Sequence, residues 1–172
     1  MDLLVLILRL IHIFGAFFWA GGSFMMVSFI EPTVMKTGEE GKKFMQYLGS
    51  RTRLSASMGV AAVLTILSGL ILYYRLFHDD FGAVMSSGYG VFLSFGALFG
   101  LLGWVAGFYF SGRASSRMKA LSEEIEAAGG PPTAEQAAEM QALAKQLTMG
   151  GRITATFLTL ALIGMAGAEA AG

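Results

Sequence analysis

Four long apolar blocks constrain this chain more than any other feature of its sequence. Each holds about 19 residues or more, which is enough for a helix to cross a hydrocarbon core of roughly 30 Å. A soluble core in so short a chain does not need four such blocks. The pattern predicts an all-α integral membrane protein, a four-transmembrane-helix up-and-down bundle. The blocks are Leu3–Ile30, Leu54–Leu76, Tyr89–Phe110 and Ile153–Ala171.

The composition supports this class and excludes several others. Only 14% of the residues are charged, against about 25% in an ordinary soluble domain. The first block is too long for a signal peptide and begins with Asp2 without a cluster of Lys or Arg, so we expect a retained helix. The absence of cysteine excludes disulfides, thiolate metal sites and thiol catalysis. A net charge of zero argues against a nucleic-acid partner.

The basic residues predict the orientation in the membrane. Ten of the twelve Lys and Arg residues lie in the two long connecting segments, and only Arg9 and Arg75 lie elsewhere. Basic residues favour the cytoplasmic side. We therefore expect both long segments in the cytoplasm and both termini outside it, in a bacterial-type inner membrane.

The segment 111–152 is predicted to form a cytoplasmic helical hairpin, within a single membrane domain that spans residues 1–172. Its apolar residues recur at helical spacing on both arms, and residues 129–132 form the turn between them. Thr133 is the expected N-cap of the returning arm. In the other long segment, Pro32 is expected to end the first helix, and residues 41–48 to form a short interfacial helix.

Small residues line the third block, as Gly96-x3-Gly100 and Gly103-x3-Gly107. Helices in lipid associate through close backbone approach, which small residues permit. We interpret these glycines as contacts inside a tightly packed monomer. The alternatives are a homodimer through this face, or docking to a larger membrane complex through this face or the hairpin.

The first block carries one polar face. Residues on it follow helical spacing: Arg9, His12, Gly15, Ala16, Trp19, Gly22, Ser23 and Met26. We expect this face to point into the bundle, because burying an ionisable side chain in hydrocarbon costs several kcal/mol unless the side chain is neutral or paired. An ionisable residue in a membrane helix is a functional hypothesis by default.

His12 has three interpretations: an imidazole that hydrogen-bonds a neighbouring helix, a haem or metal ligand, or a proton relay. Arg9 lies one turn nearer the outer face, where it either reaches the interface or holds a carboxylate. Glu169 is its expected internal partner, and a haem propionate the external one. If iron has a second ligand, Met165 is better placed than His78, which lies beyond the outer end of its helix. Ordinary core packing is the alternative for Met165.

The stretch LIHIFGAFFWAGGSFMM, with His12-x6-Trp19-x-Gly21-Gly22, resembles the first helix of small bacterial membrane proteins related to the CopD domain and to HemJ. The stretch SRTRLSASMGVAAVLTILSGLILY is similar to their second helix. The resemblance implies an up-and-down four-helix bundle. It also implies a first-helix His, here His12, directed toward b-type haem in HemJ-like proteins, which oxidise protoporphyrinogen, and copper handling in CopD-like ones.

The third block departs from the HemJ-like pattern, because residues 89–110 contain no Lys, Arg or His. This argues against the oxidase activity. Three functions then remain as hypotheses. The first is a haem-b-binding bundle for electron transfer or haem handling, in which the residues around the cofactor are Arg9, His12, Gly15, Trp19 and Met165. The second is an accessory subunit of a larger membrane complex, and the third is a copper-handling permease. A nucleophile elbow, a metal-binding His pair and a phosphate loop are all missing from the sequence, so hydrolytic chemistry is not expected.

Overall fold

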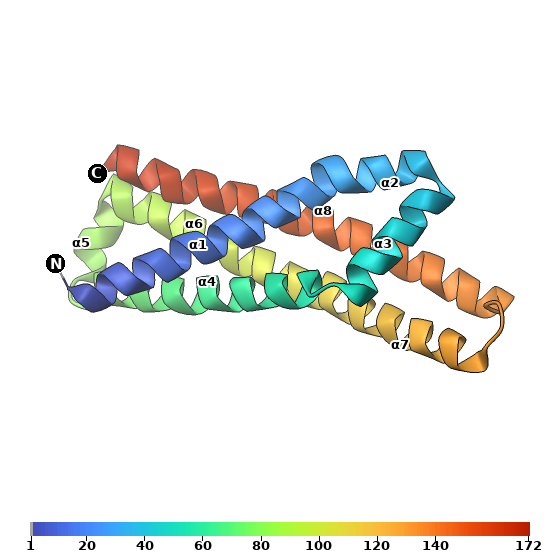
Figure 1. Ribbon diagram of the computed structural model, residues 1–172. Helices are drawn as coiled ribbons and strands as arrows, with labels where there is room; N and C mark the ends of the chain where they lie inside the picture. The colour runs from blue at the N-terminus through green and yellow to red at the C-terminus, as the bar shows by residue number, and fades with distance from the viewer. Residues whose placement is uncertain (1) are drawn as a thin grey trace.

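The computed structural model describes residues 2–172, with the side chain of Ser50 left undescribed, and this part of the chain contains helices and no strand. Figure 1 shows the arrangement, an elongated bundle with both termini at one end. The elements are α1 (Leu3–Met25), η1 (Met26–Ile30), α2 (Glu31–Thr37), α3 (Glu39–Arg51), α4 (Leu54–Phe77), α5 (Phe81–Ser86), α6 (Gly88–Ala106), η2 (Gly107–Gly112), α7 (Arg113–Ala128) and α8 (Ala134–Ala171). The segments η1 and η2 are single π-helical turns within longer helices.

Four continuous helices are long and apolar enough to cross a membrane, as the sequence predicted. They run over Leu3–Thr37, Leu54–Phe77, Gly88–Ala128 and Ala134–Ala171. Large apolar side chains cover their outer surface, and Phe17 is an example at 78% exposed. Such a surface is suited to lipid and not to water.

The first helix does not end at Pro32, and this expectation was wrong. The chain passes from α1 through η1 into α2 without a break, and Pro32 lies in the first turn of α2. Proline lacks a backbone N–H, and it follows closely after the π-helical turn η1, where the regular i→i−4 hydrogen-bond pattern is already interrupted. The helix ends instead at Gly38, whose φ of 62° lies in the left-handed region. The expected short helix follows as α3.

The hairpin is present and continuous with the membrane helices (Figure 1). Gly129, with φ 65°, ends α7, and Thr133 caps α8. The Thr133 side chain accepts from the backbone of Gln136, whose side chain accepts from the backbone of Thr133 in return. Helix α8 then runs unbroken for 38 residues, about 57 Å at 1.5 Å per residue. About half of it therefore extends beyond a 30 Å hydrocarbon core.

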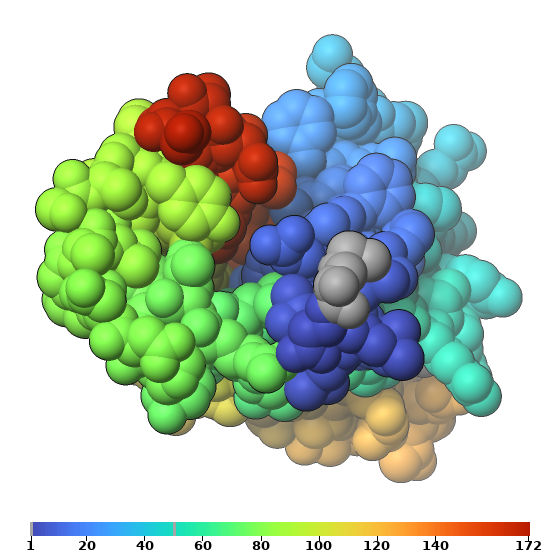
Figure 2. Space-filling model, turned by 90° about the vertical axis from the view of Figure 1, so that its left-hand side faces the viewer, coloured from blue at the N-terminus to red at the C-terminus, as the bar shows by residue number. Residues whose placement is uncertain are grey.

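The membrane helices form two antiparallel pairs. Helix α1 packs chiefly against α4, and α6 packs chiefly against α8, with fewer contacts between the pairs. The end view of Figure 2 places α1 (dark blue) and α5–α6 (green) on opposite sides, with the end of α8 (red) above them. A hydrogen bond of 2.9 Å between the hydroxyls of Tyr73 and Ser94 links α4 to α6.

Glycines allow α6 and α8 to approach closely. A Cβ atom on Gly164 would lie 2.6 Å from the backbone nitrogen of Gly96, so the two backbones are in direct contact. Farther along, Gly103 faces Leu158 and Gly107 faces Thr154. The small-residue face of the third helix is thus occupied by α8 of the same chain.

A small core joins the two pairs near the middle of the bundle. Trp19 and Ala20 of α1 pack there with Leu158 of α8 and with two alanines of α4, Ala61 and Ala62. Trp19 is only 6% exposed. Trp19 is the largest buried side chain of this cluster, and the partly buried residues packed against the cluster are Met58, Ile66 and Trp104.

Candidate functional site

The polar face of α1 points into the bundle, in agreement with the helical periodicity. Trp19 and Ser23 on this face are buried and His12 is half-buried, while Arg9 at its outer end is exposed. The opposite face carries Phe17 and other exposed apolar residues. The helix therefore presents His12 to its neighbour α4.

His12 is tied to the backbone of α4. Its Nδ1 lies 2.8 Å from the carbonyl oxygen of Thr65. That carbonyl also accepts from the hydroxyl of Ser68, at 3.2 Å, while the hydroxyl of Thr65 donates to Ala61. The contact joins the first two membrane helices at a polar point within an apolar interface.

Gly69 makes this approach possible. A Cβ atom at position 69 would lie 2.7 Å from Cε1 and 2.9 Å from Nδ1 of His12. Any side chain there would displace the imidazole from the Thr65 carbonyl. The SG dipeptide near the end of the second block, Ser68 and Gly69, thus forms the recess that receives His12.

The hydrogen bond defines the tautomer of His12. A carbonyl oxygen only accepts, so Nδ1 must donate its proton. In the neutral ring, Nε2 then carries a lone pair and is the metal-binding or proton-accepting atom. Nε2 has no hydrogen-bond partner among residues 2–172. Nε2 is also not fully buried.

Helix α4 fills the space beside the small residues on this face of α1. A Cβ atom on Gly15 would lie 2.5 Å from the hydroxyl oxygen of Thr65, and one on Gly22 would lie 2.8 Å from the sulfur of Met58. Trp19 lies in the central core and not beside an open space. These small residues therefore pack two helices together, so a planar cofactor on His12 would have to approach from the Nε2 side.

Arg9 and Glu169 form no direct ion pair, although proximity was expected. Both are exposed, and neither takes part in any ion pair among the described residues. The ion pair at this end joins Arg75 to Asp2 instead, at 2.8 Å. Asp2 also caps α1 by accepting from the backbone of Leu4. The guanidinium of Arg9 is left for solvent, headgroups or a ligand.

The other two candidate ligands lie apart from His12 in the packing. Met165 belongs to the α6–α8 pair, where its Cγ would be 3.1 Å from a Cβ on Gly96. His78 caps the end of α4 and pairs with Asp79 at 2.9 Å. No group of three or more His, Cys, Asp or Glu side chains lies close enough to hold a metal ion anywhere in the described chain.

A second polar site, which the sequence interpretation missed, lies at the other end of the apolar segments. Glu31 at the start of α2 has a side chain only 14% exposed, and its Oε2 lies 3.7 Å from Nε of Arg152 on α8. That distance is too long for a hydrogen bond, and Oε2 is buried without a partner. The hydroxyl of Thr154, close to Gly107, is likewise buried and unpartnered.

Glycines at the middle of α8 bring these groups together. Gly150 packs against Phe110 and Ser111 of η2, while Gly151 faces Val27 of η1 and Glu31. Both π-helical turns therefore meet α8 at adjacent residues. The sequence carries the Gly150–Gly151 pair as a signal of close packing, but the expected helix end at Pro32 places Glu31 at the edge of the first block rather than inside a helix.

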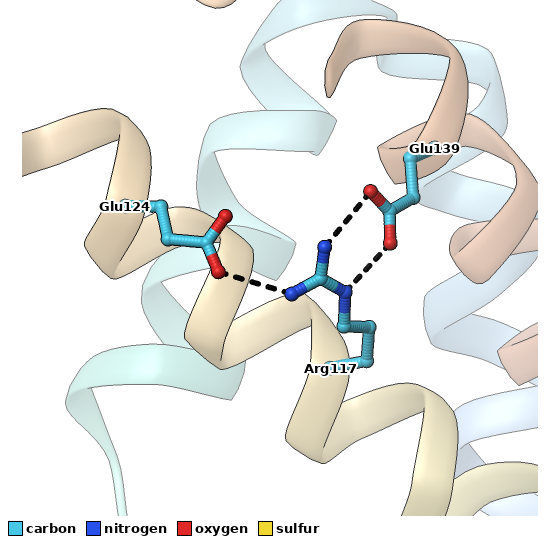
Figure 3. Close-up of polar contacts among 3 residues, drawn as sticks. All are labelled: Arg117, Glu124 and Glu139. Carbon is cyan, nitrogen blue, oxygen red and sulfur yellow. Dashed lines mark hydrogen bonds and ion pairs between the residues drawn. The ribbon is translucent and has the colours of Figure 1, made fainter. Parts of the chain in front are cut away.

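The hairpin is fastened by an ion cluster outside the apolar segments. Figure 3 shows Arg117 of α7 between Glu139 of α8 and Glu124 of its own helix. Its guanidinium donates two hydrogen bonds to Glu139, at 2.6 and 3.1 Å, and one to Glu124 at 3.0 Å. A bidentate pair of this kind sets the register of the two arms.

Comparison with known proteins adds no assignment. No family model, no curated protein and no solved structure matches this chain.

Proposed function

We propose that this protein binds a b-type haem through Nε2 of His12, for electron transfer or haem handling. The observation that supports it is the 2.8 Å hydrogen bond between His12 Nδ1 and the Thr65 carbonyl. Histidines that bind metals usually donate their other ring N–H to a carbonyl or carboxylate, which orients the ring and makes the ligating nitrogen more basic. His12 has this arrangement inside a membrane bundle.

The donor set favours haem over a metal ion held by His and carboxylate side chains. Such a site needs several protein ligands, and no group of three forms among the described His, Cys, Asp and Glu residues. The porphyrin supplies four of its iron's ligands, so one axial His is enough. Arg9, one turn from His12 and without an ion-pair partner in the described chain, would hold a propionate. Met165 packs on Gly96 in the other helix pair and is not included as a second ligand.

Bound haem would supply one-electron redox chemistry. The residues of the chain would fix the position of the haem through His12. The Thr65 carbonyl orients the imidazole, Gly69 leaves space for the imidazole, and the α1–α4 contact holds the imidazole at one depth in the bundle. The rival function, an accessory subunit, gives the same hydrogen bond a purely structural role in joining α1 to α4.

Absorbance of the purified protein separates the two functions. Expressed in cells supplied with haem, the protein is expected to show a Soret band that His12→Ala abolishes. His78→Ala is the matched control, because it removes the only other histidine and leaves the band unchanged. A colourless wild-type protein, in which His12→Ala only reduces stability by about 1 kcal/mol as for a membrane interhelical hydrogen bond, would favour the accessory subunit.

In this proposal the hairpin end faces the cytoplasm and both termini lie outside it, in a bacterial-type inner membrane. Support comes from the ten basic residues in the two long connections. Alkaline phosphatase fused after Gly172 is expected to be active, and green fluorescent protein inserted in the 129–132 turn is expected to fluoresce. Phosphatase activity at the turn and fluorescence at Gly172 would reverse the orientation.

A further inference from the structure

An open groove lies between α1 and α8, within the apolar part of the bundle. Its volume is about 300 Å³, and its lining includes Ala20, Gly21 and Phe24 of α1 and Ala155, Leu158 and Thr159 of α8. The groove is open because small residues line it. At Gly21, no other atom lies within 4 Å of the position that a Cβ would take. The groove is shaped for a flexible apolar chain.

A basic side chain stands at one end of this groove. Arg152 precedes Ala155 and Thr159 by three and seven residues, so all three lie on one stripe of α8. The rise from Arg152 to Ala155 is about 4.5 Å. Arg152 is thus placed where the apolar segments give way to the hairpin.

The guanidinium of Arg152 has unused hydrogen-bonding capacity. Its side chain is 57% exposed, and its ion-pair contact is with Glu31, at 3.7 Å. It donates no side-chain hydrogen bond to any residue that the structure describes. A guanidinium has five N–H donors in a planar fork that matches the oxygens of a phosphate.

We infer that this is a binding site for an anionic phospholipid. One acyl chain occupies the α1–α8 groove, and the phosphate binds Arg152 in the leaflet at the hairpin end. Basic pockets between membrane helices at the interface bind anionic headgroups in this way. Glu31 competes with the phosphate for the same guanidinium and lowers the affinity. The site is separate from His12, which faces α4, so it does not depend on haem binding.

Native mass spectrometry of the detergent-purified protein tests the inference. The probes are phosphatidylglycerol and phosphatidylcholine with identical acyl chains, added in equal amounts. The wild type is expected to retain phosphatidylglycerol preferentially. Arg152→Gln should reduce that preference about fivefold, the contribution of one basic residue near an anionic headgroup. Lys145→Gln is the matched control, because it removes the same charge from the same stripe of α8, two turns or about 10 Å farther from the groove.

The sign of a second substitution distinguishes a lipid site from a structural ion pair. Glu31→Gln frees Arg152 and should raise the preference for phosphatidylglycerol. A merely structural Glu31–Arg152 pair would make both substitutions shift lipid binding in the same direction. That result, or an unchanged preference in Arg152→Gln, would overturn the inference.

A third substitution tests the groove without altering charge. Gly21→Leu fills the groove where no neighbouring atom obstructs the new side chain, and should reduce retention of phosphatidylglycerol several-fold. Gly59→Leu is its control, since Gly59 of α4 is equally unobstructed. If Arg152→Gln does not fold, Gly21→Leu and Glu31→Gln still decide the outcome. Unchanged retention in Gly21→Leu would exclude the groove as the seat of the acyl chain.

Discussion

Gly164→Leu is expected to separate α6 from α8 and to destabilise the protein by about 3 kcal/mol or more, at or above the upper end of usual overpacking effects. The new Cβ would lie 2.6 Å from the nitrogen and 2.7 Å from the Cα of Gly96, and 3.0 Å from the carbonyl oxygen of Phe92. These atoms belong to the backbone and cannot rotate away. Close approach is also the main source of helix association in lipid, so its loss is not compensated.

Thermal unfolding in detergent, followed by circular dichroism, measures this effect. Gly59→Leu serves as the control, because a Cβ on Gly59 meets no other atom within 4 Å and the substitution should change the melting temperature little. Equal melting temperatures for Gly164→Leu and the wild type would show that α6 and α8 do not pack through Gly96 and Gly164.

Trp19→Ala is expected to destabilise the bundle by about 2 kcal/mol. In a soluble core, Trp→Ala costs roughly 3–5 kcal/mol, part of which is the transfer of the side chain into water. In a bilayer the exposed side chain meets lipid instead of water, so that part is largely absent and the lost packing contacts remain. The effect is still large because Trp19 is the largest buried side chain where α1, α4 and α8 meet.

Phe17→Ala is the matched control for this effect. Phe17 is an aromatic residue two positions away on the same helix, and it is 78% exposed on the outer face. Its removal should change stability by less than about 0.5 kcal/mol. Denaturation of both variants in mixed detergent micelles provides the comparison. If Phe17→Ala proves the more damaging, α1 has its faces reversed relative to the structure.

The four membrane helices were predictable because lipid requires each crossing segment to satisfy its own backbone and to present apolar side chains throughout. The hairpin was predictable because Thr133 and the turn at residues 129–132 carry local signals. Pro32 misled the prediction of the first helix. A proline inside a helix kinks or breaks it, but here the π-helical turn η1 comes just before Pro32 and the helix continues.

The inward orientation of His12 also followed from periodicity, but its partner did not. The contact with Thr65 depends on the register between α1 and α4, which is set by Gly15 against Thr65 and by Gly22 against Met58. No pattern within a single helix specifies that register. Glu31 and Arg152 were missed for the same reason, since residues 121 positions apart meet only through packing.

The π-helical turn η1 changes the direction in which the side chains of α2 point around the helix axis. Each residue of an α-helix advances by about 100° around the axis, and a π turn accommodates one additional residue. A helical wheel drawn through Leu3–Thr37 as a uniform α-helix would therefore rotate residues 31–37 by about 100° from where they lie. Rewinding this turn as regular α-helix without a deletion would turn Glu31 away from Gly151 and Arg152, whereas deleting one residue between Met26 and Ile30 would leave Glu31 facing them, because the π turn already absorbs the extra residue. The winding of this one turn thus determines which side of the first helix carries its carboxylate.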